Sequence, residues 1–233
     1  MSEDTVEEYL GSVIQHGPLN NRIYLMRLAQ DAPARFPEQL VDLAARKNYA
    51  KIFAKVPKKA VGSFQQAGFV VEAEVPLFFA GQEHAVFLGH YLDPARSRED
   101  NAATLEDILA LALTKQAGKY GALDRRFCIR PCIEGDIPVM AGIYGRTFPS
   151  YPFPIHNPGY LQETMASHVQ YFGVEAEGQL VALASAEMDR EAANVEMTDF
   201  ATLPQWAGHG LALHLLLRME QAMGQEEIKT AYT

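Results

Sequence analysis

Hydrophobic positions along residues 20–92 alternate between short apolar runs and segments with helical spacing. The runs are NRIYLMRL, AKIFAKVP, VVEAEVPLFF and HAVFLGHYL, and their lengths and apolar content favour strands. Between them stand PARFPEQLVDLAARKN and KKAVGSFQQAG, whose patterns favour helices. We therefore predict alternating strands and helices within an N-terminal domain that covers residues 1–92.

Residues 93–124 have a different pattern. The segment begins with polar residues, DPARSREDN, and continues with apolar side chains at helical spacing. These apolar positions are Leu105, Ile108, Leu109, Ala112 and Leu113. We predict a helical connector here, between the N-terminal domain and a second domain that covers residues 125–233.

The second domain starts with a predicted strand, FCIRPC, and a predicted helix, EGDIPVMAGIYGRTF, followed by the proline-rich loop SYPFPIHNP. A second helix is predicted to begin with Asn157 as its N-cap and Pro158 in its first turn, where an amide hydrogen is not needed. Apolar residues at steps of three and four predict its packed side, which comprises Leu161, Met165, Val169 and Phe172.

The remaining residues predict a hairpin, a strand, a helix and a last strand. The hairpin is YFGVEAEGQLVALASAEMD, with a tight turn at Glu177-Gly178. The next strand is NVEMTDFATL, the helix runs from Gly210 to Met223, and IKTAYT is a short final strand.

Charge and composition narrow the possible partners. The 233 residues carry a formal net charge of −9. Nonspecific binding of nucleic acid or of an anionic membrane needs a basic face, so we expect neither partner, and a cationic small molecule fits better. The N-terminus MSEDTVEEYL is acidic, unlike a signal peptide, and no apolar run approaches the roughly 20 residues that span a bilayer. We expect a cytoplasmic protein.

The two cysteines, Cys128 and Cys132, are separated by three residues in FCIRPCIEG. This spacing suits neither a zinc knuckle nor a thioredoxin-like pair, and no second cluster of cysteine and histidine accompanies it. We expect two buried thiols in a reducing compartment, and no metal site.

The stretch TLPQWAGHGLALHLLLRME contains a strand end, a proline, two glycines and an apolar helix. A glycine turn at a helix N-terminus is suited to binding an anion, because free amide hydrogens and the positive end of the helix dipole converge there. A dinucleotide site would need a third glycine where Leu213 stands. A nucleoside-triphosphate loop would need Gly-Lys-Ser or Gly-Lys-Thr, and His209, Gly210 and Leu211 do not supply it.

The order strand, helix, helix, antiparallel hairpin, long strand, glycine turn, helix, strand resembles the GNAT superfamily of acyl-CoA-dependent N-acyltransferases. The resemblance implies an α/β (α+β) fold with a mixed, mostly antiparallel sheet flanked by helices, and acetyl-CoA as cofactor. It implies that the turn holds the pyrophosphate of coenzyme A, and that the preceding strand contacts the pantetheine arm. The residues implied are Phe200, Ala201 and Thr202 for the arm, and Ala207, Gly208, His209, Gly210, Leu211 and Ala212 for the pyrophosphate.

One position of the turn departs from the superfamily signature, which is Arg or Gln, two residues, Gly, one residue, then Gly or Ala. In the register set by Pro204, Ala207 replaces the usual Arg or Gln. A register that starts at Gln205 matches the signature with Gln205, Gly208 and Gly210, but it shifts the turn relative to Pro204. Because the backbone amides supply most of the pyrophosphate contacts in this superfamily, we expect weaker cofactor affinity and not its loss.

Three strings, SYPFPI, VALASAEMD and NVEMTDFATLP, resemble a narrower family, the bacterial and archaeal β-lysine N-acetyltransferases. This resemblance implies acetylation of the terminal amine of β-lysine, which makes a neutral compatible solute. The string SFQQAGF resembles the later part of a GNAT fold, so residues 1–92 are expected to form a second, partial and non-catalytic GNAT-like domain before the catalytic one.

The same resemblance places a closing helix and two strands, with the tyrosine that protonates the leaving thiolate, beyond Thr233. We therefore expect the chain to end before the fold is complete. An open strand edge favours pairing with another chain, so a homodimer is a possible partner state.

Acyl transfer needs a neutral amine, whereas a lysine-type amine has a pKa of about 10.4, so a base must remove its proton. The resemblance favours Glu196 as that base, and period-two alternation predicts that it shares a face with Thr198, Phe200 and Thr202. Asp199 is then predicted to point to the opposite face, for substrate binding or for a structural hydrogen bond.

Other residues are candidates for binding the acceptor amine. Glu187 and Asp189 could bind a second ammonium group, although a solvated strand end explains them too. Tyr151 and Phe153 could form walls of the amine site, and an ordinary packed loop is an equal explanation. Two other functions stay open: a non-catalytic acyl-CoA-binding or regulatory module, which the Ala207 departure favours, and acetylation of protein lysines, which would need an open peptide groove.

Overall fold

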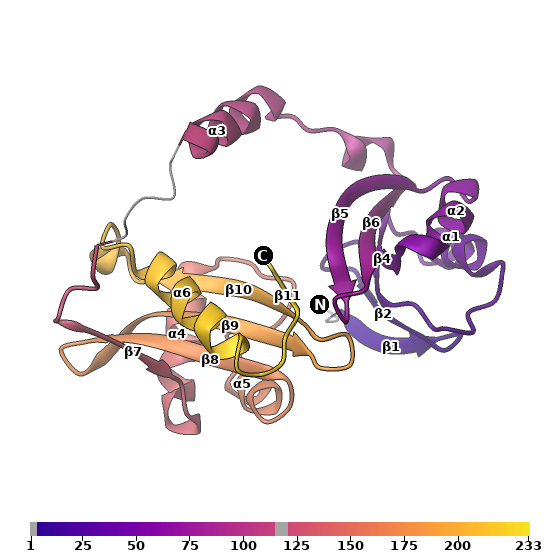
Figure 1. The fold of residues 1–233 in the computed structure, drawn as a ribbon. Helices are drawn as coiled ribbons and strands as arrows, with labels where there is room; N and C mark the ends of the chain where they lie inside the picture. The colour runs from indigo at the N-terminus through magenta and orange to yellow at the C-terminus, as the bar shows by residue number, and fades with distance from the viewer. Residues whose placement is uncertain (1–3, 115–120) are drawn as a thin grey trace.

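The computed structural model describes residues 4–114 and 121–233, and these form two sheets, each with its own helices (Figure 1). The predictions for residues 1–3, at the start of the N-terminal domain, and for residues 115–120 of the connector lie outside the described residues.

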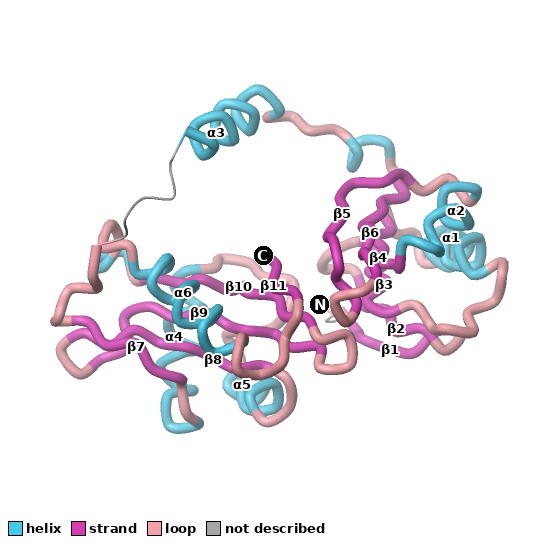
Figure 2. The backbone as a smooth tube through the Cα atoms, in the orientation of Figure 1, coloured by secondary structure: helices cyan, strands magenta, loops and turns pink. Residues whose placement is uncertain are grey.

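The N-terminal sheet has six strands in the order β1-β2-β3-β4-β6-β5, and only the β3–β4 pair is parallel. The strands are β1 (Thr5–Tyr9), β2 (Ser12–Gly17), β3 (Arg22–Arg27), β4 (Lys51–Pro57), β5 (Val70–Phe79) and β6 (Glu83–Tyr91). Two helices, α1 (Phe36–Arg46) and α2 (Val61–Gln66), pack on one face of this sheet. Figure 2 shows that they lie on the side away from the C-terminal half.

Strands β1 and β2 were not predicted from the sequence. They are joined by a two-residue turn in which Leu10 and Gly11 have positive φ angles of 50° and 78°. Gly11 adopts that conformation readily, but leucine does not favour it, so the pair Leu10-Gly11 is not a typical hairpin-turn sequence. The side chains of β1 are also largely exposed, which leaves the strand without an apolar pattern.

The connector contains α3 (Ala102–Thr114), so the predicted helix is present. None of its described residues is buried, and Leu113 is 78% exposed. Figure 1 shows α3 standing apart from both sheets. The apolar side chains that predicted this helix are therefore exposed, and no described part of the chain packs on them.

The C-terminal sheet has five strands in the order β11-β10-β9-β8-β7, antiparallel except for the β10–β11 pair. The strands are β7 (Phe127–Pro131), β8 (Val169–Ala176), β9 (Gln179–Asp189), β10 (Asn194–Thr202) and β11 (Thr230–Tyr232). The helices α4 (Ile137–Thr147) and α5 (Pro158–Met165) cover one face, and α6 (Leu211–Met223) covers the other. The predicted mixed, mostly antiparallel sheet flanked by helices is confirmed.

The predicted second helix of this half begins as expected but ends early. Asn157 caps it, because its Oδ1 atom accepts a hydrogen bond of 2.9 Å from the amide of Gly159. The helix ends at Met165, however, and Val169 and Phe172 belong to β8. Val169 and Phe172 pack in the hydrophobic cores on opposite faces of the sheet. Their spacing of three residues, which predicted a shared helix face, therefore has no structural meaning.

The two halves meet where the end of β5 lies against β11 and the β9–β10 turn. Three hydrogen bonds join the halves at this place: Asn194 Nδ2 to the Phe78 carbonyl (3.3 Å), Thr230 Oγ1 to the Leu77 carbonyl (2.6 Å) and the Ala80 amide to the Ala192 carbonyl (2.6 Å). A fourth runs from Gln15 Nε2 on β2 to the Pro152 carbonyl (3.4 Å). At the junction, the face of the N-terminal sheet that carries no helices is directed toward β11 and the β9–β10 turn (Figure 2).

Candidate active site

Two glutamates lie opposite each other in the C-terminal sheet, near the turn that joins β9 and β10. Glu187 on β9 is the cross-strand partner of Glu196 on β10, and Ser185 is the partner of Thr198 in the same register. Directly paired residues of an antiparallel ladder project from the same face of the sheet. Because Val195 and Met197 pack under α6, Glu196 faces the other side, toward α4 and α5.

A β-bulge adds a third carboxylate to this face. Between Thr198 and Ala201, β10 contains one residue more than the paired segment of β9, and Asp199 there has a positive φ of 56°. The extra residue reverses which side chains of β10 point to which face of the sheet after the bulge. The prediction that Glu196 shares a face with Phe200 and Thr202 is therefore wrong, since Phe200 packs on the α6 side and Ala201 on the other.

Asp199 also lies on the same face as Glu196, and its predicted opposite orientation is wrong. Its Oδ2 atom accepts a hydrogen bond of 2.7 Å from the buried Ser185 hydroxyl, and its Oδ1 atom accepts one from the Tyr151 hydroxyl. Burial raises the pKa of Asp199, and these two hydroxyl donors partly offset that effect. The structural hydrogen bond to a neighbouring strand, which was the alternative interpretation of Asp199, is present.

The acidity of Glu187 differs strongly from that of an ordinary glutamate. Burial, and then the charges of Asp199 and Glu196, raise its pKa to about 8, although Lys55 acts in the opposite direction. A carboxyl group with a pKa near neutrality can both hold and release a proton under physiological conditions. Such a group on one face with two other carboxylates is suited to binding a cation and exchanging its proton.

Glu196 has one described hydrogen-bond donor, the Tyr232 hydroxyl, which lies 3.2 Å from its Oε2 atom. Tyr232 is the register partner of Glu196 on β11. Burial is the largest cause that raises the pKa of Tyr232, so its hydroxyl stays protonated and acts as a donor.

The proline-rich loop reaches the carboxylates through Tyr151, which binds Asp199. Phe153 makes no such bond, and instead its ring stacks on Tyr160 with the centroids 6.5 Å apart. Tyr151 also packs on Phe148, at a centroid distance of 5.1 Å. The loop is thus packed, and Tyr151 also contacts Asp199. That Tyr151 and Phe153 form walls of the amine site stays a prediction.

The predicted cofactor-binding strand leaves an open backbone edge. Strand β11 pairs with β10 only from Asn194 to Glu196, so on that side Phe200, Ala201 and Thr202 have no strand neighbour among the described residues. Their peptide groups at this edge are placed to bind an extended ligand, as a further strand would.

The glycine turn has the backbone shape that its sequence suggested. Gly208 and Gly210 have positive φ angles of 82° and 70°, and Gly210 is the N-cap of α6. Side chains at either position would be strained, whereas glycine adopts this conformation freely. The first amides of α6, which include those of Leu211 and Ala212, have no acceptor within the helix and are available to an anion.

Arg126 lies beside this turn and was missed by the sequence analysis. Its Nη2 atom donates a hydrogen bond of 3.2 Å to His209 Nδ1, and its guanidinium lies over the Phe127 ring. Asp124 pairs with its Nε atom at 3.2 Å. One feature of the sequence could have indicated Arg126. The glycine turn lacks the Arg or Gln of the signature, and the pair Arg125-Arg126 just before a strand could supply the missing positive charge.

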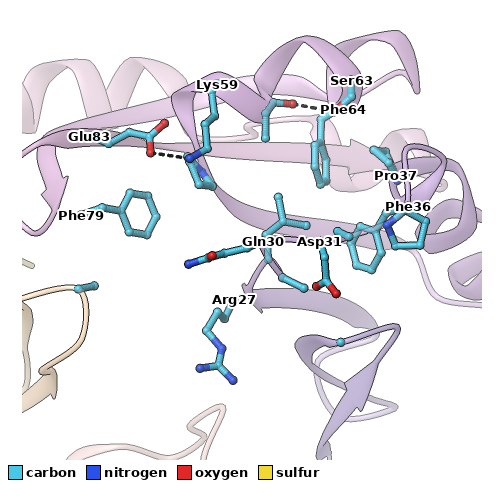
Figure 3. A pocket seen from close by; sticks show the side chains of 18 of the residues that line it. Arg27, Gln30, Asp31, Phe36, Pro37, Lys59, Ser63, Phe64, Phe79 and Glu83 are labelled. Atoms are coloured by element: carbon cyan, nitrogen blue, oxygen red, sulfur yellow. Dashed lines mark hydrogen bonds and ion pairs between the residues drawn. The ribbon is translucent and has the colours of Figure 1, made fainter.

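Asp189 is at the end of β9, where its Oδ1 atom accepts a hydrogen bond of 2.9 Å from the Ala192 amide. It also lines a cavity of about 1010 Å³ at the junction of the two halves, shown in Figure 3. Arg27, Lys59 and Glu83 line the same cavity, and Lys59 pairs with Glu83. Glu187, Glu196 and Asp199 do not line it, so this cavity is separate from the carboxylate cluster.

The cysteines differ from the prediction in one respect. Cys132 is buried, and burial raises the pKa of its thiol to about 12, but Cys128, on the edge strand β7, is exposed. Within residues 4–114 and 121–233, no three His, Cys, Asp or Glu side chains are arranged to hold a metal ion. No helix in the same ranges has the length and apolar character needed to cross a membrane.

Known proteins are similar to this chain in sequence, and one solved structure is similar to part of it. The family model described as the acetyltransferase (GNAT) family matches residues 139–233. A β-lysine N(6)-acetyltransferase of Methanococcus maripaludis is 31% identical over 230 residues, which cover 99% of this chain and 83% of that protein. One of Methanosarcina mazei is 28% identical over 87% of this chain and 83% of its own length. A solved aminoglycoside acetyltransferase from a soil metagenome has a TM-score of 0.41 at 16% identity, covering 47% of this chain and 78% of that one.

Proposed function

The chain belongs to the GNAT family of N-acetyltransferases, which use acetyl-CoA, and on this premise we propose that it acetylates the terminal amine of β-lysine. Two relatives that align with most of the chain carry that name. The observation that carries the proposal is the set of three carboxylates on one sheet face, Glu187, Glu196 and Asp199. β-Lysine has two ammonium groups, and acetylation of one lowers the positive charge, as a neutral compatible solute requires.

Acetyl-CoA binds, in this proposal, along the edge of β10 and over the glycine turn. The free peptide groups of Phe200 to Thr202 hold the pantetheine arm, and the amides from Ala207 to Ala212 hold the pyrophosphate. Arg126 supplies the positive charge that Ala207 does not, because its guanidinium reaches His209 in the same turn.

The reaction transfers the acetyl group in a balanced sequence of proton and bond changes. The terminal ammonium gives up one proton, and the neutral nitrogen attacks the thioester carbonyl carbon. As the tetrahedral intermediate collapses, the C–S bond breaks and the nitrogen loses a second proton. One of the two protons goes to the departing thiolate, and the other to solvent. The products are the N-acetylated amino acid and free coenzyme A.

We assign the first proton transfer to Glu196, directly or through a water molecule. Its position opposite Glu187 places two carboxylates at the ammonium group, and the hydrogen bond from Tyr232 fixes one of its oxygens. Glu187 and Asp199 bind the cation, and Tyr151 holds Asp199 in place. Asp199 is assigned to cation binding because two hydroxyl donors already bind its oxygens.

The test is a thiol-release assay with acetyl-CoA and a panel of β-lysine, lysine, putrescine and cadaverine, with the product identified by mass spectrometry and NMR. We expect the highest kcat/KM with β-lysine and the acetyl group on its terminal nitrogen. Coenzyme A binding without thiol release from any amine would instead support the non-catalytic binding module. Turnover confined to lysines in peptides would support protein acetylation.

A further inference from the structure

We infer that Lys55, from the N-terminal half, binds the carboxylate of the acceptor and so selects amino acids over plain diamines. This inference rests on the proposed function, because it assigns a residue to the acceptor which that function assumes. It gives the N-terminal sheet a direct part in substrate choice, although the sequence predicted only a companion domain there.

Lys55 leaves its strand on the face that the helices do not cover. Its neighbours on β4, Ala54 and Val56, are fully buried in the core beneath α1 and α2. Successive side chains of a strand point to opposite faces, so Lys55 projects from the other face of the N-terminal sheet. Its strand partner on β6 is Phe87.

A chain of contacts leads from Lys55 to the carboxylates across the junction. The Lys55 Nζ atom lies 5.2 Å from the ring centroid of Phe78, which is fully buried. The Phe78 ring lies 4.9 Å from the ring of Tyr232, and the Tyr232 hydroxyl binds Glu196. The ammonium group and the candidate base are therefore joined by two aromatic side chains, one from each half.

Lys55 differs from its neighbouring lysines because no described carboxylate lies within 4.0 Å of its ammonium group. Lys51, Lys58 and Lys59 pair with glutamates at 3.2, 2.8 and 3.2 Å. Burial lowers the pKa of Lys55, and more distant carboxylates, first Asp189 and then Glu196 and Glu187, act to raise it. A half-buried cation that lacks a close partner gains most from a ligand that supplies one.

β-Lysine supplies an anionic partner for Lys55, because it carries a carboxylate in addition to its two ammonium groups. The cluster of Glu187, Glu196 and Asp199 attracts the ammonium groups and repels the carboxylate, so this cluster alone would favour a diamine without a carboxylate. A cation facing the cluster reverses that preference. The aromatic rings beside Lys55 exclude water, and an ion pair is stronger in such surroundings.

The experiment compares Lys55→Met with the wild type on β-lysine and on cadaverine, with acetyl-CoA saturating. We expect kcat/KM for β-lysine to fall about 10- to 100-fold, which is the loss expected for a hydrogen bond to a charged group. For cadaverine we expect a change smaller than about 2-fold, because cadaverine has no carboxylate to lose its partner. Lys55→Arg should keep most of the activity with β-lysine. Lys58→Met, which removes an exposed lysine of the same half, is the matched control and should change neither value.

Three results would overturn the inference. If both kcat/KM values are unchanged in Lys55→Met, the inference is overturned and the proposed function stays intact. An equal fall for both acceptors assigns Lys55 a structural role. Wild-type turnover of cadaverine but not of β-lysine overturns the inference together with the proposed substrate. If Lys55→Met loses its circular dichroism spectrum, the same ratio is measured with Lys55→Gln, which keeps a polar end group.

Discussion

Glu187 is the direct cross-strand partner of Glu196, so two carboxylates face each other across β9 and β10. Like charges in directly opposed positions of a sheet destabilise it. In this protein the cost is reduced because the pKa of Glu187 is raised to about 8, which leaves that carboxyl largely neutral at pH 7. An arriving ammonium group favours ionisation of the pair, and this couples acceptor binding to the charge state of the site.

Removing the carboxylate of Glu196 should slow the chemical step. We expect Glu196→Gln to lower kcat with β-lysine at least about 100-fold, because positioned bases contribute about that much or more. The KM for acetyl-CoA should stay unchanged. Steady-state kinetics measure both values, and Glu220→Gln, at an exposed position of α6, is the control. A variant with full kcat would assign the proton transfer to another group.

The pH dependence of acceptor use should report on Glu187. Ionised Glu187 attracts the ammonium group and neutral Glu187 does not, so kcat/KM for β-lysine should rise as the pH passes through about 8. We expect Glu187→Gln to lower kcat/KM and to remove this limb of the profile. A limb that persists unchanged in the variant belongs to the amine itself or to another carboxylate.

The stability of the protein should depend on pH in the opposite sense. The folded-state pKa of Glu187 lies above the value of about 4.3 for an unfolded glutamate, so the folded state binds more protons between these values. This contribution to stability is complete below about pH 4 and is lost as the pH rises to about 8. Urea unfolding of the wild type and of Glu187→Gln at several pH values should show a smaller loss in the variant over that range.

Arg126 should affect the cofactor and not the acceptor. We expect Arg126→Gln to raise the KM for acetyl-CoA roughly 3- to 10-fold, a modest effect because the side chain is exposed and screened. The KM for β-lysine should stay constant. Arg125→Gln is the matched control, since it removes the adjacent exposed charge. Equal effects of the two variants would indicate general attraction of the anion by positive charge.

The packing of α6 should be essential for stability. Leu215 is fully buried between α6 and the sheet, and truncation of a buried leucine to alanine costs about 2–5 kcal/mol. Leu217 is 38% exposed on the same helix, so Leu217→Ala should cost less than about 1 kcal/mol. Chemical denaturation measures both, and similar losses would contradict the observed orientation of the helix.

Local patterns predicted most of the C-terminal half. The hairpin at Glu177-Gly178, the cap at Asn157 and the glycine turn depend on neighbours in sequence, and all three are present. The bulge at Asp199 could not be predicted, because a positive φ at an aspartate is maintained by tertiary contacts with Ser185 and Tyr151. Because the bulge reverses the orientation of the side chains that follow it, the predicted faces of Phe200 and Thr202 were wrong.

Contacts between distant segments were the other limit of the sequence analysis. Arg126 is close to His209, and the contacts that link Lys55 to Glu196 through Phe78 and Tyr232 exist only because the junction joins the two sheets. No spacing along the chain encodes either relationship. The assigned roles of the site residues stay predictions, and so do the domain boundaries, the cytoplasmic location and the homodimer.

The hydrogen bond from Asn194 to the Phe78 carbonyl joins the two halves, so expressing one half alone would break it. Asn194 is 2% exposed, so separate expression of residues 121–233 would remove the acceptor of its amide and expose the aromatic surface around Tyr232. Such a fragment would be prone to aggregation, and any specificity measured with it would lack the contribution of the N-terminal sheet. Engineering of new acceptors would therefore have to vary both halves in one library.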